Sequence, residues 1–168
     1  MTDTHTTPPR ARHAVEVDLP RDAAWRYWTR VENWAVDAAI DQVRLDGPFR
    51  AGARGETAVS GSSEIVPWTV VEVDEGRRAV LDVPADGLVA RFGWQFEELP
   101  DGRTRMTQDV TVHGRPGDAA EVAAELAQTI PAGMARLAAA MNRSQQPGGR
   151  GGVGSGAEPS GPVSPPAR

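Results

Sequence analysis

The chain has 168 residues, a length that fits one domain, and its formal net charge of −5 argues against a nucleic-acid partner. Cysteine is absent, which excludes disulfides and thiolate metal sites. All 18 residues of the lysine and arginine type are arginine, so lysine Schiff bases and lysine-containing phosphate-binding loops are excluded as well. No apolar run approaches the length of a membrane span, so we expect a cytoplasmic protein that has no membrane-spanning segment.

The two ends of the chain have a composition typical of disordered segments. Residues 1–9 are mostly Thr, Pro and other polar types, and residues 144–168 are almost entirely Gly, Pro, Ser and isolated polar groups. Such segments bury too little apolar surface to offset the entropy lost on ordering. We therefore expect a disordered N-terminus over 1–9, a folded domain over 10–143 and a disordered tail over 144–168.

The folded region begins with a strand and continues with short helices. Residues 14–19 alternate apolar and acidic side chains, which predicts a half-buried strand that ends at Pro20. Apolar residues then recur at helical spacing over 23–31, which predicts a short amphipathic helix. A second, weakly signalled helical turn is predicted over 34–40.

Short strands separated by tight turns occupy the middle of the chain. Asp46-Gly47-Pro48 and Pro100-Asp101-Gly102 are typical turn sequences. The predicted strands are residues 41–45, 56–60, 68–73, 79–83, 88–99 and 104–113. Because tight turns join consecutive strands, the sequence predicts an antiparallel meander.

A long amphipathic helix is predicted at the end of the folded region, over residues 118–142. Asp118 stands three residues before Glu121, a spacing typical of a capping box. Pro131 lies inside the apolar stripe and is expected to kink or break the helix, because it lacks a backbone N–H. Strands followed by one closing helix predict an α+β domain in which a curved sheet packs on that helix.

Several local motifs occur in a characteristic order along this chain. They are Val15-Glu16-Val17, Pro20-Arg21-Asp22-Ala23-Ala24-Trp25, Val31-Glu32-Asn33-Trp34, Val43-Arg44-Leu45-Asp46-Gly47-Pro48-Phe49 with Gly52 and Gly55, Gly102-Arg103-Thr104-Arg105-Met106-Thr107, Gly114, and Ile130-Pro131-Ala132-Gly133-Met134. In this order they resemble the START-like superfamily, also called the SRPBCC or polyketide cyclase/dehydrase-like group, over residues 12–142.

The resemblance implies a helix-grip fold: α+β, with a curved antiparallel sheet of about seven strands around a long C-terminal helix and two short helices after the first strand. It also implies a central cavity for a hydrophobic compound. The superfamily has no universal catalytic motif, so the catalytic residues stay unknown and the fold supports a pocket without a mechanism.

Strand alternation and helix periodicity place mostly aromatic side chains around the expected cavity. If Met106 and Val110 face inward, Gln108 faces inward too. The predicted ligand-binding residues are Tyr27, Trp68, Phe92, Trp94, Phe96, Gln108, Ile130 and Met134. For any one aromatic residue, ordinary core packing is the alternative interpretation.

Titratable residues give little indication of catalysis. His113 shares the outward parity of Asp109, whereas His13 has inward parity at the start of its strand. Neither histidine has a partner at metal-ligand spacing, so we expect no metal and no cofactor. Arginines such as Arg50, Arg54 and Arg91 have two interpretations: recognition of a ligand carboxylate at the pocket mouth, or simple solubilisation of the surface.

Three functions are compatible with the sequence. The first is a monomer or homodimer that binds a small hydrophobic, lipid- or polyketide-like molecule between sheet and helix. The second is a polyketide cyclase/aromatase-like enzyme acting by aldol cyclisation and dehydration, in which Tyr27, Gln108 or an arginine polarises a carbonyl. The third is a protein-interaction module of the chaperone-activator type, which an exposed apolar patch would favour. We prefer the first, because no acid–base pair stands out.

Overall fold

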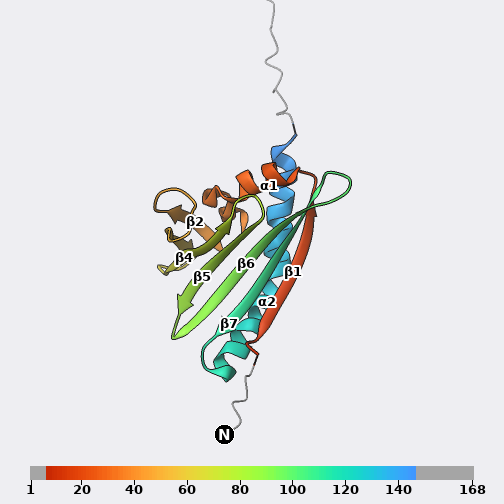
Figure 1. Ribbon diagram of the computed structural model, residues 1–168. Helices are drawn as coiled ribbons and strands as arrows, with labels where there is room; N and C mark the ends of the chain where they lie inside the picture. The colour runs from red at the N-terminus through yellow and green to blue at the C-terminus, as the bar shows by residue number, and fades with distance from the viewer. Residues whose placement is uncertain (1–6, 147–168) are drawn as a thin grey trace, which may run out of the picture.

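A seven-stranded antiparallel sheet curls around one long helix in the computed structural model, which describes residues 7–146 (Figure 1). This confirms the predicted helix-grip fold. The predictions of disorder for residues 1–6 and 147–168 lie outside the described residues. The Pro9 carbonyl accepts a hydrogen bond from the Val112 N–H at 3.1 Å, so pairing with the sheet begins just before the first strand.

The elements follow the predicted order, with boundaries that differ by a few residues. They are β1 (Arg10–Val17), α1 (Arg21–Trp28), the 3₁₀ helix η1 (Val31–Val36), β2 (Ile40–Leu45), β3 (Arg54–Val59), β4 (Ile65–Asp74), β5 (Arg78–Ala85), β6 (Leu88–Glu98), β7 (Thr104–His113) and α2 (Pro116–Ser144). Differences of three or four residues occur at the start of β1, at both ends of η1, at the end of α1 and at the start of β4. Element ends are where propensity decides least, because tertiary packing extends or trims them.

The strand order is β1-β7-β6-β5-β4-β3-β2, so each strand pairs with its neighbour in sequence except that β1 closes onto β7. Two register shifts bend the sheet: one lies between Val70 and Glu72 of β4, the other between Ile40 and Gln42 of β2. Extra residues of this kind increase the local twist of a strand. The curled sheet leaves a concave face, and α2 lies across it against β1 and β7 (Figure 1).

The inward parity predicted for β6 and β7 is confirmed. Met106 and Val110 are fully buried, and Gln108 between them is 8% exposed. Trp94 is directly opposite Gln108 in the β6–β7 pairing, so both side chains lie on the same face of the sheet. Both strands are free of bulges, which is why simple alternation succeeded there.

Two expectations for α2 are wrong, namely a start at Asp118 with a capping box and a break at Pro131, while a kink at Pro131 stays a prediction. The helix begins at Pro116, two residues before the predicted start, and Asp118 forms no capping hydrogen bond. Proline at this position needs no N–H partner and has the helical φ already, so it starts the helix without a side-chain cap. The helix also continues unbroken through Pro131. The missing N–H of Pro131 leaves the Ala127 carbonyl without its helical donor, and because Ala127 is an exposed residue, water can reach that carbonyl.

An aromatic cluster fills one end of the space beneath the sheet. Trp28 is completely buried and lies 5.2 to 5.4 Å, between ring centroids, from Phe49, Trp94, Phe96 and Trp34. Trp25 packs edge-on against Phe96 at 5.2 Å. Contacts at these distances are typical of stabilising aromatic pairs, so α1 is anchored on the sheet mainly through Trp25 and Trp28. Within residues 7–146, none of the helices is long and apolar enough to cross a membrane.

Candidate functional site

A cavity of about 650 Å³ lies between the concave face of the sheet and α2. Its walls come from η1 and the segment after it, from β3 to β7, and from the middle of α2. The aromatic cluster around Trp28 closes one end. The volume falls within the range of about 300–1,000 Å³ that is usual for small-molecule sites.

Six of the eight predicted ligand-binding residues line this cavity: Trp68, Phe92, Trp94, Gln108, Ile130 and Met134. Tyr27 and Phe96 do not. Phe96 faces inward but lies two residues beyond Trp94 on β6, where Trp25 and Trp28 cover it. On α1 it is the neighbouring Trp28, not Tyr27, that turns to the cavity, because successive helical residues point about 100° apart. Whether the six residues bind a ligand stays a prediction.

Two pairs of tryptophans form rigid walls. Trp28 backs Trp94 and Trp34 backs Trp68, each pair with ring centroids 5.2 Å apart. The Trp34 indole N–H donates to the Trp28 carbonyl at 2.8 Å, and the Trp68 indole N–H donates to Thr57 Oγ1 at 3.1 Å. These bonds hold Trp34 and Trp68 in place before any ligand arrives, which lowers the entropic cost of binding, whereas the Trp28 indole N–H is buried without a partner among residues 7–146.

Gly55 leaves the space that the Trp68 ring occupies. It is paired with Trp68 across β3 and β4, and a Cβ at Gly55 would overlap the Trp68 indole. Gly55 lies one residue before the strand predicted over residues 56–60 and was named above only as part of a motif. A glycine inside a strand is, however, a known signal for the close approach of another group, and it could have indicated this site.

Gln108 is the polar group on the floor of the cavity. It lies on β7 between Trp94 of β6 and His13 of β1, on the inner face of the sheet. Its side chain is 8% exposed and forms no hydrogen bond with any residue in the described part of the chain. His13 is half-buried but does not line the cavity, and His113 is exposed as predicted.

An ion pair forms part of the cavity wall near α2. Arg136 Nη2 of α2 donates to Asp37 Oδ1, just after η1, at 2.9 Å. Gly133 makes room for this contact, since a Cβ there would press against Asp37 Oδ2. Arg136 and Asp37 are the charged residues of the lining, and they neutralise each other. Arg50, Arg54 and Arg91 do not line the cavity. Arg136 was not among the predicted residues, because helical periodicity does not show which exposed arginine contacts a residue outside the helix.

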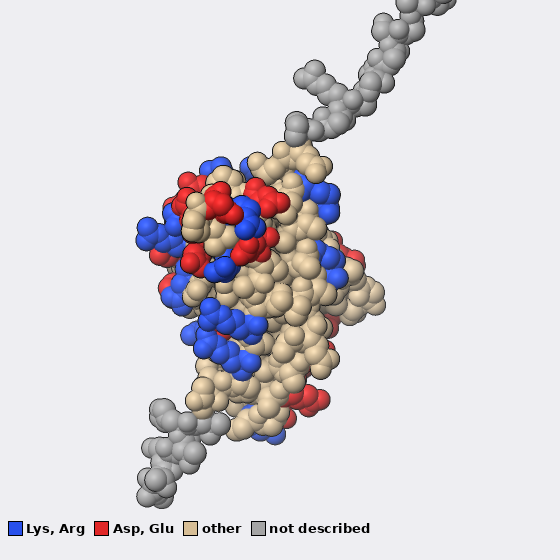
Figure 2. All heavy atoms as spheres, turned by 90° about the vertical axis from the view of Figure 1, so that its right-hand side faces the viewer, with Lys and Arg blue, Asp and Glu red and all other residues tan. Residues whose placement is uncertain are grey.

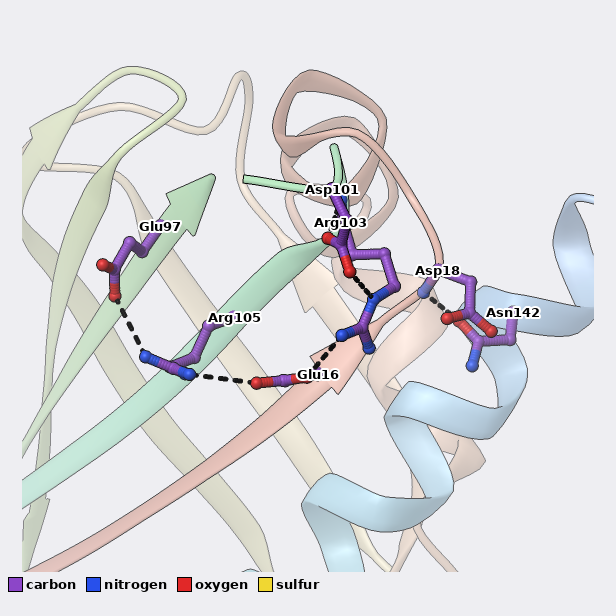
Figure 3. Close-up of polar contacts among 7 residues, drawn as sticks. All are labelled: Glu16, Asp18, Glu97, Asp101, Arg103, Arg105 and Asn142. Carbon is purple, nitrogen blue, oxygen red and sulfur yellow. Dashed lines mark hydrogen bonds and ion pairs between the residues drawn. The ribbon is translucent and has the colours of Figure 1, made fainter. Parts of the chain in front are cut away.

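Other charged groups lie on the outer surface. Figure 3 shows a chain of ion pairs that runs from Glu97 through Arg105, Glu16 and Arg103 to Asp101, and joins β6, β7 and β1. The Asp18 N–H donates to Asn142 Oδ1 at 2.8 Å, which ties the end of β1 to α2. Figure 2 shows the molecule from the right-hand side of Figure 1, and there acidic and basic side chains gather toward the upper left, beside a broad area with few charged side chains.

The pKa shifts also belong to the outer surface. A hydrogen bond from Arg10 lowers the pKa of Asp109, and its charge adds to the effect, while partial burial opposes it. A hydrogen bond from Arg103 lowers the pKa of Asp101 in the same way. Among residues 7–146, no three His, Asp or Glu side chains are placed to hold a metal ion.

Comparison with known proteins agrees with this geometry. The profile of the family described as "Polyketide cyclase / dehydrase and lipid transport" matches residues 8–142, most of the chain. The chain belongs to this family. No curated protein matches the sequence significantly.

Several solved structures have the same fold as this chain. NE0264 from Nitrosomonas europaea is 19% identical, with a TM-score of 0.67 over 81% of this chain and 96% of that one. TTHA0849 from Thermus thermophilus is 16% identical, with a TM-score of 0.63 over 82% of this chain and 99% of that one. DynU16, a protein of the dynemicin biosynthetic locus, is 22% identical, with a TM-score of 0.61 over 81% of this chain and 48% of that one. At these identities the likeness shows the fold alone.

Proposed function

We propose that this protein binds a small hydrophobic, lipid- or polyketide-like molecule in the cavity between the sheet and α2. The observation that carries the proposal is the cavity itself, about 650 Å³ with tryptophan and phenylalanine walls. Transfer of an apolar ligand from water to such walls is favourable by about 25 cal/mol for each Å² of apolar surface removed from water. The family, whose description includes lipid transport, supports the same function.

The test is a thermal-shift screen of the chain against fatty acids, sterols, flavonoids and aromatic polyketides. A ligand that binds only the folded state, at 100 times its dissociation constant, adds about 2.7 kcal/mol to the free energy of unfolding. We expect at least one class to raise the melting temperature. The absence of a shift for every class would contradict the proposal.

Two phenylalanines on one face of β6 allow a test of where the ligand binds. Phe92 lines the cavity, whereas Phe96 lies under Trp25 and Trp28. Phe92→Leu should weaken the binding of a hit about three- to tenfold, the equivalent of one lost aromatic contact. Phe96→Leu is the matched control and should lower stability with little change in affinity. Equal effects on affinity would place the ligand elsewhere.

A cyclase is the second candidate, and the position of Gln108 is the observation that favours it. Its amide N–H groups can donate to a ligand carbonyl inside a cavity of low polarity, where such a bond stabilises developing negative charge. Incubation with a poly-β-ketone mimic, followed by chromatography of the products, tests this activity. Cyclised product above the uncatalysed background would support a cyclase, and product formation unchanged in Gln108→Leu would exclude this role of Gln108.

Three further expectations stay predictions: the cytoplasmic location, the monomeric or homodimeric state, and the interaction-module alternative. The well-exposed large apolar side chains of the described residues are Ile65 and Val71, both on β4. A pull-down with Ile65→Ser as the comparison would test whether β4 contacts a partner protein. Light scattering of the full chain would give the oligomeric state.

A further inference from the structure

The buried amide of Gln108 indicates what kind of ligand the cavity accepts. Gln108 is only 8% exposed, it lines the cavity, and its side chain has no hydrogen-bond partner among residues 7–146. The buried Thr104 on the same strand and face, in contrast, donates to the Leu19 carbonyl at 2.7 Å. Among residues 7–146 the fully enclosed polar side-chain atoms without a partner are Arg21 Nε and Trp28 Nε1, so the Gln108 amide is not sealed off but open to the cavity. Polar groups of buried residues are nearly always hydrogen-bonded, and Gln108 is therefore suited to water or to a partner from outside the chain.

An amide makes two demands at once. Its oxygen accepts hydrogen bonds and its NH₂ group donates them, and the two lie side by side in one plane. Water can satisfy both when no ligand is bound. An apolar ligand that displaces this water leaves both groups without a hydrogen-bond partner, and this cost lowers its affinity. A ligand with an acceptor next to a donor restores both bonds and avoids this cost.

The rest of the lining narrows the ligand further. The indole N–H groups of Trp34 and Trp68 already have acceptors within the protein, whereas the N–H of Trp28 is enclosed, has no acceptor among residues 7–146 and can only donate. Asp37 and Arg136 neutralise each other, so the wall has no free charge to pair with a charged ligand. Burial of an unpaired charge costs far more than burial of a neutral polar group. The tryptophans and Phe92 present flat apolar surfaces, which suit fused rings.

We propose that the cavity selects an uncharged, flat polycyclic ligand that carries a hydrogen-bond acceptor beside a donor, as in a cis-amide (lactam), and that Gln108 pairs with both. The inference rests on the proposed function, since it assigns a ligand class to the same cavity. It also makes Gln108 a specificity-determining residue. A site that holds a polar group for a hydrogen bond rejects an analogue without that group more strongly than an apolar pocket rejects a missing methylene.

Four probes with one ring system test this selection: 6(5H)-phenanthridinone, its N-methyl derivative, phenanthrene and phenanthrene-9-carboxylate. The first has the acceptor–donor pair, the second lacks the donor, the third lacks both groups, and the fourth carries a charge. Dissociation constants come from quenching of tryptophan fluorescence in the full chain. We expect the lactam to bind about tenfold or more tightly than each of the other three.

Gln108→Leu is the decisive variant, because leucine has a similar size and no polar atom. In this variant the lactam should lose its advantage and bind no more tightly than phenanthrene, because its C=O and N–H would be buried against leucine, while phenanthrene binds at least as tightly as to the wild-type protein. Binding of phenanthrene also shows that the variant is folded. Any effect of the N-methyl group on fit alone would persist in Gln108→Leu, so the variant separates shape from hydrogen bonding.

Several outcomes would overturn the inference. Equal affinity of the wild-type protein for all four probes would leave cavity binding intact and remove the role of Gln108. The same conclusion would follow if the preference for the lactam survived in Gln108→Leu. Tightest binding of the carboxylate, reversed by Arg136→Gln, would replace Gln108 with an anion site at Arg136. Failure of all four probes and of the whole lipid and polyketide panel would overturn the proposed function itself.

Discussion

Gln108 and Asp109 are neighbours on β7, yet their polar groups have opposite surroundings. Asp109 points to the outer face, where Arg10 of β1 donates two hydrogen bonds to its carboxylate and Arg12 lies nearby. Gln108 points to the inner face and has no partner in the described chain. The outer face satisfies its charges with cross-strand pairs, as the Arg91–Asp82 pair at 2.8 Å also shows.

The comparison of these two residues indicates which polar side chains of the sheet are suited to bind a ligand. Exposed cross-strand ion pairs are worth little, because water already solvates both partners. A buried amide without a partner is costly once water leaves, so its retention needs another explanation. Of two adjacent polar residues, the uncharged one is therefore the better candidate for ligand recognition. Substitutions on the two faces of the sheet should therefore differ in their effects on stability and on ligand binding.

The first prediction concerns the contact between Gly55 and the Trp68 ring. Gly55→Ala should lower the free energy of unfolding by about 3 kcal/mol, the upper part of the range for overpacking, because the new methyl group overlaps the Trp68 ring. It should also weaken ligand binding, since Trp68 forms a cavity wall. Urea denaturation followed by fluorescence measures the first effect. Gly117→Ala is the control, because a Cβ there meets open space, and an equal loss in the control would refute the account.

The second prediction uses a buried polar group that does have a partner. Thr104 is fully buried and its hydroxyl donates to the Leu19 carbonyl. Thr104→Val leaves that carbonyl without its partner, so the free energy of unfolding should fall by about 1–2 kcal/mol. Gln108→Leu in the same denaturation assay should change it by about 0.5 kcal/mol or less, since no hydrogen bond within the chain is lost. A large loss in Gln108→Leu would mean that the amide stabilises the fold itself.

The third prediction concerns the ion pair at the edge of the cavity. Arg136→Gln removes the bond to Asp37 that joins the η1–β2 segment to α2. A partly exposed pair is worth about 0.2–1 kcal/mol, so the dissociation rate of a bound ligand should rise by at most about fivefold. Stopped-flow displacement measures this rate. Arg143→Gln, on the last turn of the same helix, should leave it unchanged. An unchanged rate in Arg136→Gln would show that ligands enter by another path.

The fourth prediction concerns the outer face and pH. The pKa of Asp109 is lowered in the folded state, so its bonds to Arg10 stabilise the fold above the pKa of the unfolded chain. That contribution is lost as the pH falls through the folded pKa. Asp109→Asn should thus be slightly less stable than the wild type at about pH 5–7, with the gap closing below about pH 4. A gap that persists at about pH 2, below the usual carboxyl range, would indicate lost packing instead of lost charge.

Much of the architecture could be predicted because strand and helix periodicities report directly on burial. Alternation on β7 gave the inward direction of Gln108, and the same rule on β6 gave Trp94. Phe96 shows the limit of that rule, since it obeys the alternation and yet lies under α1. The sequence distance between Phe96 and Trp25 carries no sign of this contact. Only the packing of α1 on the sheet separates the filled end from the hollow end.

The order of the elements, the two faces of β6 and β7 and the presence of one long amphipathic helix could all be predicted from the amino-acid sequence. These features depend on local geometry, because side chains alternate along a strand and recur every 3.6 residues in a helix. Only the tertiary structure decided which tryptophans pack together and which border a cavity, that α2 runs unbroken through Pro131, and that Arg136 meets Asp37. Such features depend on contacts between residues far apart in the chain, and no local pattern encodes them.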